Sequence, residues 1–223
     1  MSLFKRKPKE VGGVIGAWGL SEWWLSEFTV EEQNQLVDKL VKSDMFQRGN
    51  IYTKGEYYYD ISELPGELIS LPRRLISWAT FVQKPETRHI AYKLANMAES
   101  LINDQMDIVD LYFYYHNKIG VYYRNRNEDP DSLDIAIEAC KKQIEIAPDA
   151  KAEMHKRDLE RFGETRYDIG NVGFKQLRII EEKRGNYQEA LKLSHDAKKQ
   201  RWAGNWDKDI ERLHKKLNKT MEK

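Results

Sequence analysis

Residues 136–148 read AIEACKKQIEIAP and predict an amphipathic α-helix that ends at Pro148. Alanine, isoleucine and cysteine side chains recur at helical spacing and share one face, while lysine and glutamate occupy the other. Proline lacks a backbone N–H and is typical of the position where a helix stops. Upstream, Ile119, Gly120 and Tyr123 belong to another apolar run. The two runs together favour a helical hairpin.

The helical pattern continues on both sides of this stretch. Pro85 is expected in the first turn of a helix that passes through Leu94 and Ala98, and Asp104 is expected to begin the next helix. Because the turns between such helices are short, consecutive helices must pack antiparallel. We predict a mainly α-helical fold of antiparallel hairpins. The expected breaks fall at Pro72, Pro85, Asn103-Asp104, Asp129-Pro130, Pro148 and around Gly204.

The N-terminal part of the chain has a different character. Its basic, glycine-rich start predicts a flexible arm rather than a helix. Thr29 and Glu32 form a capping box that predicts the start of a helix. Residues 51–61 carry β-branched and aromatic side chains around a Lys-Gly pair, which predicts a short hairpin or an extended loop. The predicted domains are an arm (1–20), an N-terminal helical region with the possible hairpin (21–85) and a helical array (86–223).

Composition narrows the classes of partner. The chain has 223 residues, and its 37 Lys and Arg nearly balance its 36 Asp and Glu. This balance gives no reason to expect a polyanionic partner, so nucleic acid is disfavoured. The single cysteine, Cys140, excludes an intramolecular disulfide. No apolar run approaches the roughly 18 residues that cross a membrane. We expect a cytoplasmic protein.

No catalytic or cofactor motif stands out. The five histidines are scattered, with no HExxH pattern, so we predict no metal site. The glycine-rich stretch at 12–19 lacks the Gly-Lys-Ser or Gly-Lys-Thr of a phosphate-binding loop. Cys140 occupies an apolar helix position where a small buried side chain is expected. We therefore expect a protein that is not an enzyme and that uses no cofactor.

Two segments resemble the tetratricopeptide repeat. The stretch 136–148 is similar to the second helix of a repeat, and GNYQEAL at 185–191 is similar to the turn and second helix of another. The resemblance covers roughly residues 86–217 and implies an α–α superhelix. It also implies that Gly120 and Ala136 are the small residues at a helix crossing. The run 173–217 is in addition similar to that of bacterial proteins with no assigned activity.

Two further helices are expected in this array. Residues 150–161 are strongly charged and predict an extra helix, separate from 136–148, that ends at Gly163. Residues 206–217 predict a helix with Ile210, Leu213 and Leu217 on one face and basic residues elsewhere. Such a helix suits the cap that a stacked array requires.

The resemblance implies that the chain binds a protein or peptide along the concave face made by the first helices. The tyrosine-rich helix around Tyr114 is either packed on both sides or presents its aromatic and polar groups to that face. The paired Lys and Asn of the family's basic clamp for C-terminal carboxylates do not both match, so we do not expect a chaperone-tail ligand. The candidate contacts are Tyr114, Asn117, Val121, Arg124, Lys175, Ile179 and Lys183.

Two other functions stay open. A structural protein could form a homo-oligomer through Trp23 and Trp24 or through the tyrosine-rich helix. An enzyme could assemble its site from dispersed residues, with His116, Asp110 and Glu138 as the candidates. That alternative predicts a deep cleft in which ionisable groups converge. The tryptophan pair is otherwise expected to dock the N-terminal helices.

Overall fold

A computed structural model describes residues 11–42, 69–165 and 169–221, which form ten helices and no β-strand. This confirms the prediction of a mainly helical fold. The hairpin predicted at 51–61 and the first half of the predicted arm lie outside the described residues. Within the described part, no helix is both long enough and apolar enough to cross a membrane.

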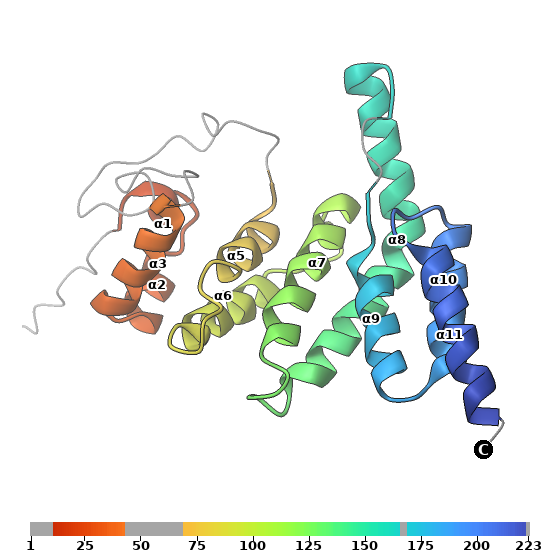
Figure 1. Cartoon of the computed structure of the whole chain (residues 1–223). Coiled ribbons are helices and arrows are strands. Elements are labelled where there is room, and N and C mark those ends of the chain that lie inside the picture. The colour runs from red at the N-terminus through yellow and green to blue at the C-terminus, as the bar shows by residue number, and fades with distance from the viewer. Residues whose placement is uncertain (1–10, 43–68, 166–168, 222–223) are drawn as a thin grey trace, which may run out of the picture. The chain divides into compact units, whose positions relative to one another are not determined.

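The chain divides into two compact units, Met1–Asn103 and Asp104–Lys223. The predicted boundary after residue 85 differs from this division, because the helix Arg88–Ser100 groups with the first unit. The first unit contains α1 (Gly13–Ala17), α2 (Ser21–Glu27), α3 (Val30–Lys42), α5 (Leu71–Ala79) and α6 (Arg88–Ser100). These are the red to yellow helices of Figure 1.

Helix α1 corrects the prediction that residues 1–20 cannot form a helix. Val14 and Ile15 are fully buried, and this burial of apolar surface outweighs the low helix propensity of glycine. Glycine is also required at two positions. Gly13 has a φ of 70°, and a Cβ at Gly16 would lie 1.8 Å from the Val11 carbonyl oxygen.

The capping box of α3 is confirmed. The Thr29 backbone N–H donates to Glu32 Oε2 at 2.7 Å, and the Glu32 N–H donates to Thr29 Oγ1 at 3.2 Å. Glu32 also accepts from Lys93 of α6 at 2.7 Å, so the cap ties two helices of the unit together. Trp24 is fully buried, and Trp23 packs edge-on against Phe28.

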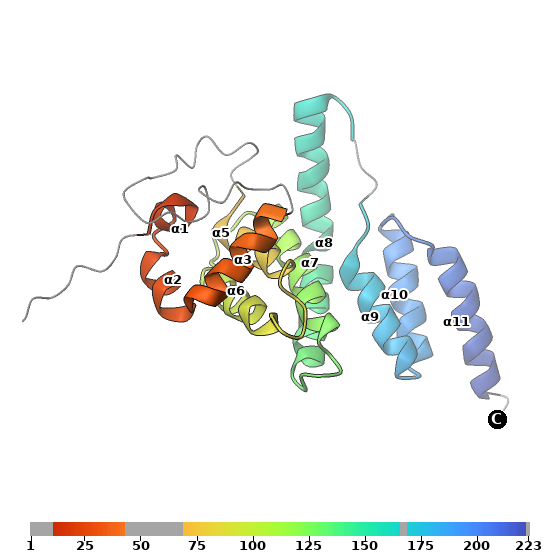
Figure 2. The same ribbon diagram turned by 60° about the vertical axis from the view of Figure 1, so that its left-hand side comes forward.

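The second unit contains five helices in the order of the chain. They are α7 (Ile108–Arg124), α8 (Ser132–Phe162), α9 (Val172–Lys183), α10 (Tyr187–Lys199) and α11 (Trp206–Met221). Helix α7 packs on α8, α8 on α9, α9 on α10 and α10 on α11. Figure 2 shows α9, α10 and α11 side by side. Asp107, rather than Asp104, caps α7 by accepting from the backbone N–H groups of Val109 and Asp110.

The prediction that a helix ends at Pro148 and another begins at residue 150 is wrong. Helix α8 runs for 31 residues through Pro148 and extends beyond α9 and α10 in both ribbon views (Figures 1 and 2). Its second half contacts residues that flank the ends of α7 and α10. Arg157 pairs with Asp107, and Lys151 Nζ donates to the carbonyl oxygens of Gln200 and Arg201. The predicted end at Gly163 is confirmed, since that residue adopts a φ of 76°.

The predicted crossing at Gly120 is also wrong. Gly120 is exposed, and a Cβ added to it would meet no described atom within 4 Å. Ala136 is fully buried, as expected of a small residue between helices. The close approach in this unit occurs at Gly173 of α9, where a Cβ would lie 2.8 Å from the carbonyl oxygen of Cys140 in α8.

The core of the second unit is continuous from α7 to the start of α11. Tyr112 is fully buried and stacks on Trp202 with ring centroids 5.7 Å apart. Cys140 lies in the same core, and burial raises the pKa of its thiol to about 12. A thiol in that state is a packing group rather than a nucleophile. Leu213 of α11 packs with Ala190 and Leu191 of α10, so α11 lies against α10.

Candidate functional site

A cavity of about 540 Å³ lies in the second unit between α7, the start of α9 and the start of α11. Helix α7 contributes His116, the turn from α10 to α11 contributes small residues, and Trp206 at the start of α11 also lines the cavity. The volume falls within the roughly 300–1,000 Å³ typical of ligand sites. The lining residues are His116, Ile169, Gly170, Asn171, Val172, Lys175, Arg178, Ala203, Gly204, Asn205, Trp206 and Asp209.

Local hydrogen bonds fix the walls of this cavity. Asn171 caps α9, because its Oδ1 accepts from the backbone N–H of Phe174 at 2.9 Å. The N–H of Ala203 donates to the carbonyl oxygen of Ile169 at 3.2 Å and joins the two loops that border the cavity. Trp206 Nε1 donates to the Trp202 carbonyl oxygen at 2.7 Å. The cavity is therefore bounded by backbone and aromatic groups with set positions.

A cluster of charges lies at one end of the cavity. Arg178, only 7% exposed, donates from Nη1 to Glu182 at 3.1 Å and from Nη2 to Asp209 at 3.2 Å. Arg212 pairs with both of these carboxylates, and Lys216 lies 2.9 Å from Glu182. Burial raises the pKa of Glu182, but the hydrogen bond from Lys216 and the charge of Arg212 outweigh this and lower it. Glu182 is therefore charged at neutral pH.

Three polar atoms around the cavity are shielded from solvent and have no hydrogen-bond partner among the described residues. They are Asn171 Nδ2, Arg178 Nε and His116 Nδ1. Most buried polar groups in proteins are paired, so three unpaired ones around one space require an explanation. Burial lowers the pKa of His116, which keeps its imidazole neutral at pH 7, with one ring nitrogen as donor and the other as acceptor.

One residue of the predicted contact set lines the cavity. Lys175 is exposed there and makes no ion pair with a described residue. The other six predicted residues are not among those that line it. Tyr114 and Val121 are fully buried, Asn117 and Ile179 are half-buried, and Arg124 and Lys183 are exposed.

Sequence reasoning did not select Asn171, Arg178, Trp206 or Asp209. An Asn just before an apolar helix is a signal for an N-cap, but that signal says nothing of its free amide group. Arg178 is followed four residues later by Glu182, a pattern typical of an exposed ion pair rather than of a buried one. The proximity of these residues depends on the packing of α9 against α11.

The three residues proposed for an enzyme do not line this cavity together. His116 lines the cavity, whereas Asp110 and Glu138 do not. Glu138 is exposed on α8 with Lys141 at 3.9 Å. Across the described ranges, no group of three His, Cys, Asp or Glu residues is placed to hold a metal ion.

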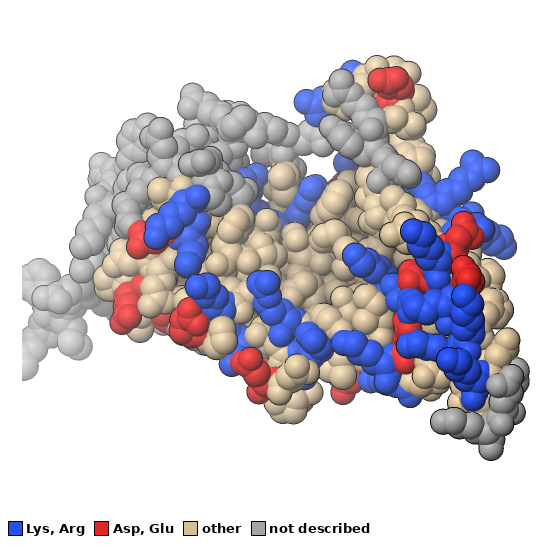
Figure 3. All heavy atoms as spheres, viewed as in Figure 1, with Lys and Arg blue, Asp and Glu red and all other residues tan. Residues whose placement is uncertain are grey.

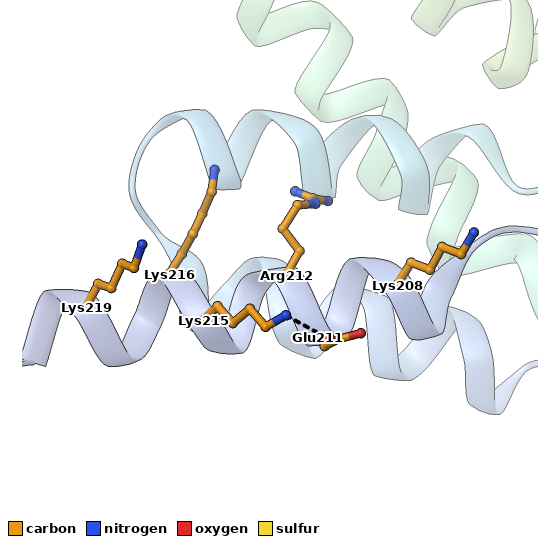
Figure 4. Close-up of a pocket in the computed structure, with 6 residues that line it drawn as sticks. All are labelled: Lys208, Glu211, Arg212, Lys215, Lys216 and Lys219. Atoms are coloured by element: carbon orange, nitrogen blue, oxygen red, sulfur yellow. Dashed lines mark hydrogen bonds and ion pairs between the residues drawn. The ribbon is translucent and has the colours of Figure 1, made fainter.

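A second, shallower hollow of about 300 Å³ runs along α11. Lys and Arg side chains gather over α10 and α11 in Figure 3, with carboxylates between them. Figure 4 shows Arg212 and Lys216 extending toward the neighbouring helix, while Lys215 pairs with Glu211. Ion pairs neutralise much of the charge of this hollow, and one helix supplies all its walls. It is therefore a weaker candidate for a ligand site than the cavity between α7, α9 and α11. Its lining residues are Lys208, Glu211, Arg212, Lys215, Lys216 and Lys219.

The chain matches no family model, no curated protein and no solved structure. The tetratricopeptide resemblance therefore stays a prediction. Because a fold hosts many functions, a function has to be argued from the chemistry of a site. The cavity between α7, α9 and α11 supplies that chemistry.

Proposed function

We propose that this chain is a protein- or peptide-binding module of tetratricopeptide-like helical hairpins. The pairs α7–α8 and α9–α10 would be the two hairpins, with α11 as the cap. In this arrangement α7 and α9 are the first helices, and both contribute to the cavity. The proposal places one side chain of the partner in that cavity.

The observation that carries the proposal is the set of unpaired polar atoms on Asn171, Arg178 and His116. An unpaired buried donor costs roughly 1–3 kcal/mol, which a bound group can recover. Ile169, Val172 and Trp206 line the same space and offer apolar contact. Apolar walls with a few fixed polar groups are typical of binding sites.

The variant Asn171→Ser tests the role of the cavity. Serine is as good an N-cap as asparagine, so the variant keeps the acceptor for the Phe174 N–H and removes the free amide donor. The matched control is Lys192→Gln, because Lys192 is exposed on α10 and does not line the cavity. Circular dichroism and thermal unfolding verify that both variants keep the fold.

The experiment screens the purified, labelled chain against an array of random-sequence peptides, some with free and some with amidated C-termini. We expect wild type to retain a set of peptides with a shared motif. Asn171→Ser should weaken their binding about tenfold, the effect of losing one good hydrogen bond, and Lys192→Gln should leave it unchanged. Retention of no peptide, or equal retention by the Asn171→Ser variant, would reject the proposal.

A further inference from the structure

We propose that His195 and His214 together bind one divalent transition-metal ion at the seam between α10 and α11. This inference goes beyond the proposed function, because neither histidine lines the cavity between α7, α9 and α11. In the sequence the five histidines form no metal-binding pattern. The packing of α10 against α11 nevertheless brings these two imidazole rings into contact.

The separation of the two rings is close to that of a shared ligand site. The ring centroids of His195 and His214 lie 6.3 Å apart, and the ring planes are inclined at 67°. A metal ion lies about 2.0–2.1 Å from an imidazole nitrogen, so two rings that share one ion at a tetrahedral angle have centroids about 5 Å apart. Both side chains are exposed. Rotation about their χ angles is therefore free to close the remaining distance of about 1 Å.

The backbone that carries the rings is fixed by buried neighbours. Ser194 and Leu213, the residues directly before the two histidines, are fully buried. Leu213 belongs to the apolar cluster that joins α11 to α10. Each histidine thus leaves the edge of a packed seam with its ring in solvent. Once one imidazole binds an ion, the other is already at a high effective concentration, and this favours one shared ion.

The charges near the pair indicate the class of ion. Lys192 and Lys199 lie one turn before and one turn after His195 on α10, and both are exposed. Their positive charges oppose an ion that is held by charge alone, and Ca²⁺ and Mg²⁺ in addition require oxygen ligands. Imidazole nitrogen forms coordination bonds with Zn²⁺, Ni²⁺ and Cu²⁺. The site therefore suits these transition-metal ions.

Glu211 is a further side chain near the pair in the sequence of α11. It lies three residues before His214 and so shares its face of the helix, in a Glu-x-x-His spacing that also serves metal binding in helix bundles. Its carboxylate is paired with Lys215 at 2.6 Å, and no group of three His, Cys, Asp or Glu among the described residues is placed to hold a metal ion. The proposal therefore rests on the two imidazoles, with water in the remaining coordination positions.

Pulsed electron paramagnetic resonance of the full chain with one equivalent of Cu²⁺ tests the proposal. The remote nitrogen of each bound imidazole modulates the signal, so the spectra count the rings on the ion. The variants are His195→Asn and His214→Asn. The matched control is His155→Asn, because His155 lies on α8. Calorimetric titration with Zn²⁺ measures affinity, and circular dichroism verifies that each variant keeps the fold.

We expect two imidazoles on Cu²⁺ in wild type and in the control, and one at most in either variant. Each variant should weaken Zn²⁺ binding about tenfold or more, and the double variant little further, since either change removes the shared site. An ion that binds both helices stabilises the docked arrangement of α11 on α10. Zn²⁺ should therefore raise the midpoint of urea unfolding more in wild type than in either variant.

Three results would overturn the proposal. They are a single imidazole on Cu²⁺ in wild type, Zn²⁺ binding that is absent or equal in wild type and either variant, and equal Zn²⁺-induced shifts of the urea midpoint in all of them. None of these results bears on peptide binding, which the Asn171→Ser variant tests in a separate part of the unit.

Discussion

The side-chain oxygen of Gln143 in α8 accepts a hydrogen bond from the backbone N–H of Gly173 in α9 at 2.6 Å. The amide nitrogen of the same fully buried glutamine donates to the carbonyl oxygen of Tyr112 in α7 at 3.2 Å. One side chain thus connects three helices. It fixes the first turn of α9, and this turn carries Asn171 and Lys175 into the cavity.

Gly173→Ala is expected to destabilise the chain. A Cβ at this position would lie 2.8 Å from the Cys140 carbonyl oxygen and 3.0 Å from Gln143 Oε1. Backbone on one side and a fixed hydrogen bond on the other leave little room to relax, so we expect a loss of about 1–3 kcal/mol in the free energy of unfolding. Urea denaturation measures it.

Gly120→Ala is the matched control, because Gly120 is an exposed helical glycine with open space around it among the described residues. Alanine there should raise stability by about 0.5–1 kcal/mol. Equal effects of the two alanines would show that helix propensity, rather than the approach of α9 to α8, decides the outcome.

Gln143→Glu is expected to make stability depend on pH. A neutral Glu can still accept from Gly173 and donate to the Tyr112 carbonyl oxygen, whereas a buried carboxylate cannot donate. Burial raises the pKa of this carboxyl in the folded state, so the penalty relative to wild type is small below the unfolded pKa of about 4.3 and grows as the pH rises.

Unfolding of both proteins in urea at pH 4.5 and at pH 7.5 measures this penalty. We expect the larger difference from wild type at pH 7.5. A difference that does not change with pH would mean that the pKa of the introduced carboxyl is not raised in the folded state, so that its charge costs nothing there.

The features that sequence reasoning predicted correctly depend on neighbouring residues. The Thr29 capping box and the left-handed Gly163 are each settled within one helical turn. The end at Pro148 was also predicted from local sequence and was wrong. Helix α8 continues through the proline, and Arg157 and Lys151 in its second half bind groups about 50 residues away.

The cavity could not be predicted from the sequence for the same reason. Lys175 was selected from its place on a first helix, and it does line the cavity. The unpaired donors of Asn171 and Arg178 carry no pattern in the sequence, since what makes them unusual is the absence of a partner after folding. Gly173 looks like any helical glycine until α8 is packed against it.

Asp107→Asn is expected to lower stability at neutral pH and to have less effect in acid. Asp107 caps α7 and pairs with Arg157. Burial raises its pKa, but hydrogen bonds from Arg157 and the backbone outweigh this and lower it. Its stabilising charge is therefore fully present above the unfolded pKa of about 3.9 and is lost as the pH falls through the lowered value.

Asparagine keeps the cap acceptor Oδ1, so the variant removes the charge and the Oδ2 acceptor of Arg157 but leaves the cap in place. Because the pair is partly exposed, we expect a loss of about 0.5–1 kcal/mol at pH 7 that shrinks below pH 4. Asp134→Asn, in the first turn of α8, is the control, since Asp134 is exposed and pairs with no described residue. An equal loss in both variants would point to the helix dipole rather than to Arg157.

Pro148→Ala is expected to stabilise the chain. Pro148 is exposed inside α8 and cannot donate to the carbonyl oxygen one turn earlier, so alanine adds a backbone hydrogen bond and buries nothing new. A proline inside a helix costs about 3 kcal/mol, part of which is offset because proline also restricts the unfolded chain. We therefore expect a gain of about 1 kcal/mol in the free energy of unfolding.

Pro130→Ala is the comparison for this gain, because Pro130 is exposed in the turn before α8 begins at Ser132. Its replacement adds no helical bond and should leave stability unchanged or slightly lower. Urea denaturation of the two variants beside wild type separates the helix effect from the unfolded-state effect. A Pro148→Ala variant no more stable than wild type would mean that the contacts of Arg157 and Lys151 hold α8 in a geometry that already suits proline.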